Sequence, residues 1–263
     1  MDTALELALL RVAVAPAFIG LISLIQLRLG NQTAGWLVAL PINTGTIVAV
    51  LALTQGLTFA ASTASGALSG VISVAAFVAG YALSARRLSW LPCLGLALAA
   101  FVFSTLILNA APLTLPLGLF AALLSVVVVL PAVRSCGEGQ SRGPAPRWEI
   151  PLRMFTAGCL VLGVTALSTT LGARLSGLIA PIPVFTITLV AFTHSREGVV
   201  PIFQFLRGLL NGMVGFAIFC VTTAILLPAL GIVAAEAVGF AGFAAAYPLT
   251  ERAFLILADS AHP

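Results

Sequence analysis

Long apolar stretches separated by short polar connections make up almost the entire chain. A helix needs about 20 apolar residues to cross the hydrocarbon core of a bilayer. Of 263 residues, 60% are hydrophobic and 8% are charged, with a mean hydropathy of +1.16. A typical soluble domain carries roughly 25% charged residues. The sequence therefore predicts an integral membrane protein in contact with the lipid bilayer, and it excludes a soluble catalytic or nucleic-acid-binding domain.

Nine apolar stretches are long enough to be spanning helices, which predicts an all-α fold. They cover residues 5–27, 34–54, 59–84, 90–108, 113–133, 152–171, 175–193, 199–226 and 230–247. A loop at 134–150, rich in Gly, Pro and Arg, indicates a cytoplasmic linker between a first transmembrane repeat at 1–133 and a second at 151–263. We expect residues 248–263, which carry several charges, to form an amphipathic or disordered tail rather than a tenth span.

The basic residues, all arginines, predict the orientation of these spans. Cytoplasmic loops carry an excess of basic residues. With nine spans, one face of the membrane clearly receives only Arg174. The other face receives Arg28, Arg86, Arg87, Arg134, Arg142, Arg147, Arg196 and Arg252. The arginine-rich face should be cytoplasmic, which places the N-terminus outside and the C-terminus inside.

The chain contains an internal repeat at an offset of 142 residues, which aligns 11–77 with 153–219 without a gap. Its five glycine coincidences compare with roughly 0.6 expected by chance. The matched pairs include Gly30/Gly172, Gly35/Gly177, Gly56/Gly198, Gly66/Gly208, Gly70/Gly212, Pro41/Pro183, Thr44/Thr186, Thr46/Thr188 and Arg11/Arg153. Each unit holds five spans, an odd number, so the second copy should enter the bilayer from the opposite side. Inverted repeats of this kind, five spans and then four, are characteristic of secondary transporters.

Both copies place a proline in the middle of a span. Proline removes an intrahelical hydrogen bond and clashes with the preceding turn, so we expect both helices to be interrupted there. Backbone groups freed at membrane depth persist only where they face protein or a water-filled cavity. We expect the two helices to cross or oppose each other at the midplane and to line a substrate or ion site. Its candidate residues are Pro41, Asn43, Thr44, Thr46, Pro183, Thr186 and Thr188. The alternative interpretation is two kinks whose threonines bond back to their own helices.

Ionisable side chains inside spans are a second indication of function. Arg207, with Asn211 one turn later, lies in the eighth predicted span, and Glu236 lies in the ninth. We include all three among the candidate binding residues. Arg207 and Glu236 enter from opposite faces to similar depth, so the two side chains could pair. Three interpretations of Arg207 stay open: it neutralises Glu236, it presents a cation to an anionic substrate, or it extends to the interface.

Two further polar groups have both a structural and a functional interpretation. The third predicted span carries a small-residue face that favours close helix packing or ion coordination; it consists of Ser62, Thr63, Ser65 and Ser69 with Gly66 and Gly70. His194, Arg196 and Glu197 follow the seventh predicted span and indicate a cytoplasmic turn or gate.

Motifs of soluble catalysis do not occur in the sequence. It has no Walker loop, no zinc-protease helix motif, no nucleophile elbow and no dinucleotide-binding glycine motif. We expect no enzymatic activity, no cofactor and no bound metal. The expected partners are the bilayer and a small molecule or ion, and a homodimer stays open.

A recurring unit consists of Leu-Gly, four residues, Gly, five residues, Pro and, after fourteen more residues, a loop Gly. It covers residues 29–70 and 171–212 and is similar to a unit of small bacterial membrane proteins of the GlpM-like kind, here duplicated and fused. The resemblance implies a bacterial inner-membrane protein. In such a membrane, the orientation expected from the arginine distribution places the N-terminus in the periplasm. In plan, the chain also resembles bile-acid-symporter-like and sodium/proton-antiporter-like folds. Those folds interrupt the fourth helix of each repeat, not the second, and carry acidic ion ligands that have no counterpart located here.

The function that these patterns favour is a secondary transporter or permease for a small solute, an anion if Arg207 contacts it. It would work by alternating access around the two proline-interrupted helices. The alternative is a non-transporting scaffold or the membrane subunit of a larger complex. An intramembrane lipid-modifying enzyme comes third, because no nucleophile and base pair is evident.

Overall fold

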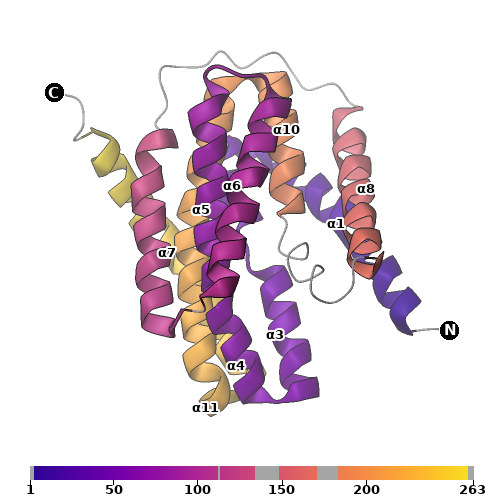
Figure 1. The fold of residues 1–263 in the computed structure, drawn as a ribbon, viewed down its shortest axis with the longest axis vertical. Coiled ribbons are helices and arrows are strands. Elements are labelled where there is room, and N and C mark those ends of the chain that lie inside the picture. The colour runs from indigo at the N-terminus through magenta and orange to yellow at the C-terminus, as the bar shows by residue number, and fades with distance from the viewer. Residues whose placement is uncertain (1–2, 112, 134–147, 171–182, 260–263) are drawn as a thin grey trace.

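The computed structural model describes residues 3–111, 113–133, 148–170 and 183–259, and within these ranges the chain forms helices and no strands (Figure 1). The first half contains α1 (Thr3–Leu29), α2 (Asn31–Val38), α3 (Ile42–Gln55), α4 (Leu57–Gly66), α5 (Leu68–Ala85), α6 (Trp90–Ala110), α7 (Leu115–Val129) and the short 3₁₀ helix η1 (Leu130–Val133). The second half contains α8 (Glu149–Thr170), α10 (Val184–Glu197) and α11 (Val199–Asp259). Most of the predicted linker, residues 134–147, lies outside the described ranges.

Five helical stretches in the described part of the chain are long and apolar enough to cross a membrane. They are Asn31–Gln55, Leu57–Ala85, Trp90–Ala110, Leu115–Val133 and Val199–Arg252. Their outer surfaces carry large apolar side chains, and Leu53, Leu83, Phe103 and Val233 are each at least 67% exposed. Such surfaces are stable next to lipid tails and unfavourable in water. The helices are therefore those of a multi-pass membrane protein.

Gly231 divides α11 into two antiparallel arms. Its φ of 76° lies in the left-handed region, and the chain reverses there between a first arm (residues 199–230) and a second arm (residues 232–259). The residues after Tyr247, predicted to form an amphipathic or disordered tail, are helical as far as Asp259, because the second arm continues through Pro248. Polar contacts hold this extension: the Thr250 hydroxyl donates to Asn211 Oδ1, and Gln32 Nε2 donates to Glu251 Oε1 at 3.3 Å.

The short helix α2 packs on the first arm of α11 at backbone contact distance. A Cβ atom on Gly208 would lie 1.9 Å from the carbonyl oxygen of Gln32, and one on Gly35 would lie 2.0 Å from that of Phe205. Gly212, one turn after Gly208, would place a Cβ 2.4 Å from Ala39 Cβ. Glycines at this spacing let two membrane helices approach closely. Here they fix the helix that precedes the first proline.

Alanine at position 208 tests this packing, and alanine at the repeat-equivalent Gly66 is the matched control. Because a Cβ at 208 must displace backbone, we expect Gly208→Ala to destabilise the protein by about 1–3 kcal/mol or more. Gly66 has open space around its Cβ position, so Gly66→Ala should be neutral or slightly stabilising. Unfolding of each variant in detergent micelles measures the difference, and equal stabilities would contradict the close approach.

Candidate substrate and ion site

The first predicted interruption is present between α2 and α3. The amides of Ala39 and Leu40 close α2 by donating to the carbonyls of Trp36 and Leu37, both at 3.1 Å. The chain then turns, and buried Pro41 caps the start of α3, with its carbonyl accepting from Gly45 N at 2.8 Å. Proline is favourable at a helix start because an N–H at that position has no intrahelical acceptor, so the proline loses no hydrogen bond by lacking one. Pro41 therefore ends one helix and begins the next.

The second proline begins a helix of the same length. α10 starts after Pro183, and α3 and α10 each have 14 residues with bounds related by the offset of 142. Ile187 N donates to the Pro183 carbonyl at 2.9 Å, as Gly45 N does to Pro41. Gly56 and Gly198, which follow the two helices, both have φ of 94°. The sequence repeat thus extends to the backbone, whereas residues 171–182, before Pro183, lie outside the described ranges.

The two helices start near the middle of the molecule and run toward opposite ends, α3 toward the lower end and α10 toward the upper end in Figure 1. The expectation that the two whole spans cross or oppose each other stays a prediction, because residues 171–182 lie outside the described ranges. No Cα atoms of α3 and α10 lie within 8 Å of each other, so these two helices do not touch. They instead direct their N-terminal ends toward the same central level. A helix N-terminus carries about half a positive charge, which makes this level favourable for an anion.

The second threonine of each predicted pair bonds back to the backbone of its own helix. Thr46 donates to the Ile42 carbonyl at 2.8 Å, and Thr188 donates to the Val184 carbonyl at 3.0 Å. This is the arrangement of the alternative interpretation, so neither hydroxyl proton is available to a ligand. Thr186 and Thr188 are buried, Thr44 is half-buried, and Asn43 and Thr46 are exposed. The threonine pattern thus repeats within each helix without joining the two helices in one site.

Glu236 faces the first turn of α3. Its Oε2 atom lies 3.6 Å from the position that a Cβ on Gly45 would occupy, beside the rings of Phe219 and Phe240. Its Oε1 atom is buried and has no hydrogen-bond partner among the described residues. The structure therefore brings one predicted ionisable residue to the predicted interruption.

Arg207 does not pair with Glu236. Gly215 packs on Phe243 and Gly239 packs on Thr223, so residue 236 is level with positions near 224 of the first arm. Arg207 is about 17 residues, or roughly 25 Å, from that level at 1.5 Å per residue. The sequence could not show this separation, because it depends on the chain reversing at Gly231, only five residues before Glu236, which leaves the carboxylate far from the level of Arg207.

Arg207 and Asn211 instead form a group of unpaired donors on the first arm. Arg207 is half-buried, and within the described ranges its Nε and Nη2 atoms have no partner. Asn211 is 1% exposed, and its Nδ2 atom is likewise unpaired. Their repeat equivalents, Ser65 and Ser69, line a cavity of about 160 Å³ in the first half. Ser69 donates to the Gly66 carbonyl at 2.7 Å, which favours a local role for that hydroxyl.

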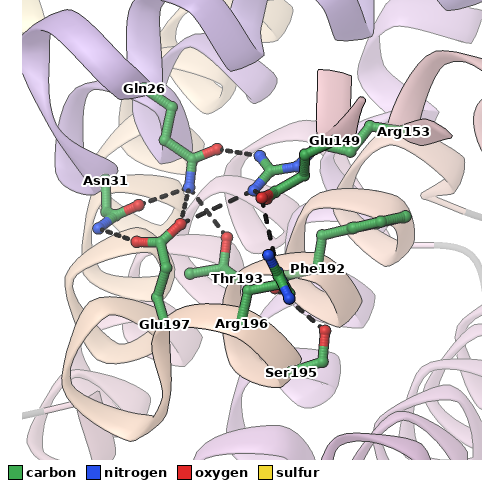
Figure 2. A network of polar contacts seen from close by, with 9 residues as sticks. All are labelled: Gln26, Asn31, Glu149, Arg153, Phe192, Thr193, Ser195, Arg196 and Glu197. Atoms are coloured by element: carbon green, nitrogen blue, oxygen red, sulfur yellow. Dashed lines mark hydrogen bonds and ion pairs between the residues drawn. The ribbon is translucent and has the colours of Figure 1, made fainter. Parts of the chain in front are cut away.

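A buried network of charged and amide side chains connects the two halves of the chain (Figure 2). Arg153 lies at its centre and donates to Glu149 Oε1 at 2.5 Å and to Gln26 Oε1 at 2.6 Å. Gln26 Nε2 donates to Thr193 at 2.9 Å, and Asn31 Nδ2 donates to Glu197 Oε2 at 3.1 Å. Gln26 and Asn31 belong to the first half, and their partners belong to the second.

The network balances its charges inside the protein. Arg153 Nη2 also lies 3.7 Å from Glu197 Oε1, and Arg196 Nε lies 3.6 Å from Glu149 Oε2. Glu149 and Arg153 are 3% and 4% exposed. Burial raises the pKa of the Glu197 carboxyl, an effect that the hydrogen bond from Asn31 and the charge of Arg153 only partly offset. Nearby, Tyr81 Oη and His194 Nδ1 share a hydrogen bond of 2.9 Å.

Sequence reasoning found only part of this network. His194, Arg196 and Glu197 were predicted as a turn or gate, whereas Gln26 and Asn31 were not selected. Glu149, predicted to lie in the linker, instead begins α8. The spacing of Glu149 and Arg153, four residues apart on one helix, was a usable signal of an ion pair. No comparable signal indicated Gln26, because a single amide at a helix end has no characteristic spacing.

Comparisons of the chain with protein families, with curated proteins and with solved structures give no match. The resemblance to GlpM-like proteins therefore stays a prediction. Within the described ranges, no group of three or more His, Cys, Asp or Glu side chains is arranged to hold a metal ion. The function is therefore inferred from the positions of the interrupted helices and of the buried polar side chains.

Replacing Arg153 tests whether the network stabilises the contact between the halves. Arg153→Gln would remove the buried cation between Glu149 and the half-buried Glu197 and leave Glu149 only the more distant Arg196, so we expect a loss of about 3–5 kcal/mol. The double variant with Glu149→Gln removes one unpaired charge and should recover a substantial part. Unfolding of the purified protein in detergent measures both. If Arg153→Gln alone were as stable as the unchanged protein, the network would have no structural role.

Proposed function

We propose that the chain is a secondary transporter of the bacterial inner membrane that moves a small anionic solute by alternating access. In this proposal, nine spans form two inverted repeats around proline-interrupted helices. The observation that carries it is the pair of 14-residue helices α3 and α10, which begin after equivalent prolines and direct their N-termini toward one central level. Two positive helix ends at the centre of a membrane protein attract an anion.

The opposite directions of α3 and α10 support the inverted arrangement. When a unit with an odd number of spans is duplicated in one chain, the second copy enters the membrane from the other side. Equivalent helices of the two copies then run toward opposite faces of the membrane, as α3 and α10 run toward opposite ends of the molecule. The matched helix bounds and left-handed glycines support the equivalence of the two units.

The buried network is suited to act as a gate at the arginine-rich end. It joins the ends of α1, α8 and α10, and the bond between Tyr81 and His194 places the C-terminal end of α5 beside it. Its contacts run between the halves that would move relative to each other. Hydrogen bonds and ion pairs can exchange for water when such an interface opens, which apolar packing cannot do.

Arg207 and Asn211 are suited to receive the solute on its path. A half-buried guanidinium with two unpaired N–H groups favours a negatively charged ligand. Asn211 adds an unpaired amide one helical turn away on the same face. This agrees with the interpretation in which Arg207 presents a cation to an anionic substrate.

Uptake into proteoliposomes tests the transporter proposal. With a panel of small carboxylates, phosphate and sulfate, we expect saturable uptake of at least one anion above that of protein-free vesicles. Arg207→Gln should lower this uptake by at least about tenfold, equivalent to about 1.4 kcal/mol, and Arg207→Lys should lower it less. Arg252→Gln, at an exposed arginine of the second arm, is the matched control and should transport normally.

A scaffold gives a different outcome in the same assay. No anion of the panel would enter above background, although the protein would be folded and monodisperse. Uptake that is equal for the unchanged protein and for Arg207→Gln would keep transport but remove the role of Arg207.

Cysteine labelling from the two sides of the membrane tests the topology. We expect a cysteine in the linker 134–150 to react only with cytoplasmic reagent and Arg174→Cys only with periplasmic reagent, as the arginine distribution requires. Labelling of both positions from one side would contradict the inverted repeat.

A further inference from the structure

We propose that Glu236 binds the proton that couples transport, at the first turn of α3. The coupling rests on the proposed function, whereas the protonation itself does not. Glu236 reaches α3 from the second arm of α11, and its Oε2 atom lies 3.6 Å from the Cβ position of Gly45. Because Gly45 carries no side chain, the carboxyl group can lie directly beside the helix.

Among the described residues, the surroundings of Glu236 provide no opposite charge. Neither α3, α4 nor α7 contains an ionisable residue, and α5 contains only Tyr81. The first arm contains Arg207, roughly 25 Å away by the helical rise, and Cys220, which is uncharged as a thiol. On the second arm itself, the ionisable residues other than Glu236 begin at Tyr247, and the one cation there, Arg252, lies 16 residues or roughly 24 Å further along the helix. A carboxylate held in apolar surroundings without a cation is strongly unfavourable and becomes neutral by taking up a proton.

The same surroundings favour a proton over a metal cation. A sodium or calcium ion needs several oxygen ligands. The other side chains that lie within 4 Å of the Gly45 Cβ position, together with Glu236 Oε2, are the rings of Phe219 and Phe240. In the part of the chain that the structure describes, the buried hydroxyl Thr223 Oγ1 has no partner and lies 3.0 Å from the Cβ position of Gly239, almost one turn along the arm from Glu236. One carboxyl and one hydroxyl are enough to hold a proton and too few to enclose a metal ion.

Protonation would couple to solute binding through the helix end. The positive end of α3 can stabilise one negative charge, either the Glu236 carboxylate or an anionic solute. Two anions at this site would repel each other in a medium of low dielectric constant. A proton on Glu236 therefore frees the helix end for the solute, so that proton and anion bind together and leave together.

Carbodiimide labelling of the full-length protein in lipid nanodiscs tests the proton site without any transport. Dicyclohexylcarbodiimide reacts with protonated carboxyl groups in apolar surroundings, and mass spectrometry locates the adduct. We expect modification of Glu236 that decreases as the pH rises and does not change with Na⁺ at constant ionic strength. Glu236→Gln should lose the adduct, and Glu251→Gln, at a carboxylate bonded to Gln32 on the same arm, should keep it.

Two results would overturn the proton site. Absence of modification at every pH would show a permanently ionised carboxylate, and protection by Na⁺ at fixed pH would show a cation site instead. Since Gln has the shape of the protonated acid, we expect Glu236→Gln to fold, which size-exclusion chromatography verifies.

Uptake driven by a pH gradient tests the coupling. Glu236→Gln should lose the acceleration by the gradient but keep exchange of labelled for unlabelled anion across the membrane. An acceleration equal to that of the unchanged protein would overturn the coupling. If no variant transports any anion while Glu236 is labelled as expected, the proposed function fails and the proton site stands.

Discussion

Main-chain polar groups find no hydrogen-bond partners in lipid, and this constraint determines where a membrane helix can be interrupted. The turn at Ala39–Pro41 satisfies it by internal contacts: the last amides close α2, and the Pro41 carbonyl accepts the first bond of α3. The turn must also be covered by protein, and the glycine contacts between α2 and the first arm of α11 provide this cover. The interruption and the close helix packing are therefore two parts of one solution.

Buried charged side chains also need partners inside the protein, and the polar sites differ in whether they have them. Arg153 is buried with Glu149 and Glu197 within reach, and the amides of Gln26 and Asn31 occupy remaining donor and acceptor positions. Glu236 and Arg207 are different, because each keeps buried polar atoms unpaired in the part of the chain that the structure describes. A satisfied network stabilises one arrangement, whereas unpaired groups favour binding a ligand or a proton. The molecule thus separates its structural polar contacts from those suited to binding.

The sequence allowed the class of fold and the interrupted helix at Pro41 to be predicted, because hydrophobic length and proline chemistry act locally. The repeat was visible as matched glycines, and the bounds of α3 and α10 follow it. Contacts across the molecule were not predictable in this way. The partner of Glu236 depends on how sharply Gly231 turns the chain, and the partners of Arg153 depend on which helix ends meet. Sequence spacing does not determine either quantity, so from the sequence alone the pairing of Arg207 with Glu236 stays one of three interpretations; the structure does not place the two side chains together.

Equivalent glycines of the two copies experience different surroundings. Gly208 touches the main chain of α2, whereas Gly66 has open space where a methyl group could fit. Natural selection therefore acts unequally on two codons that descend from one ancestor if the halves arose by gene duplication. Position 208 should tolerate no replacement over evolutionary time, while position 66 is free to drift toward alanine or serine.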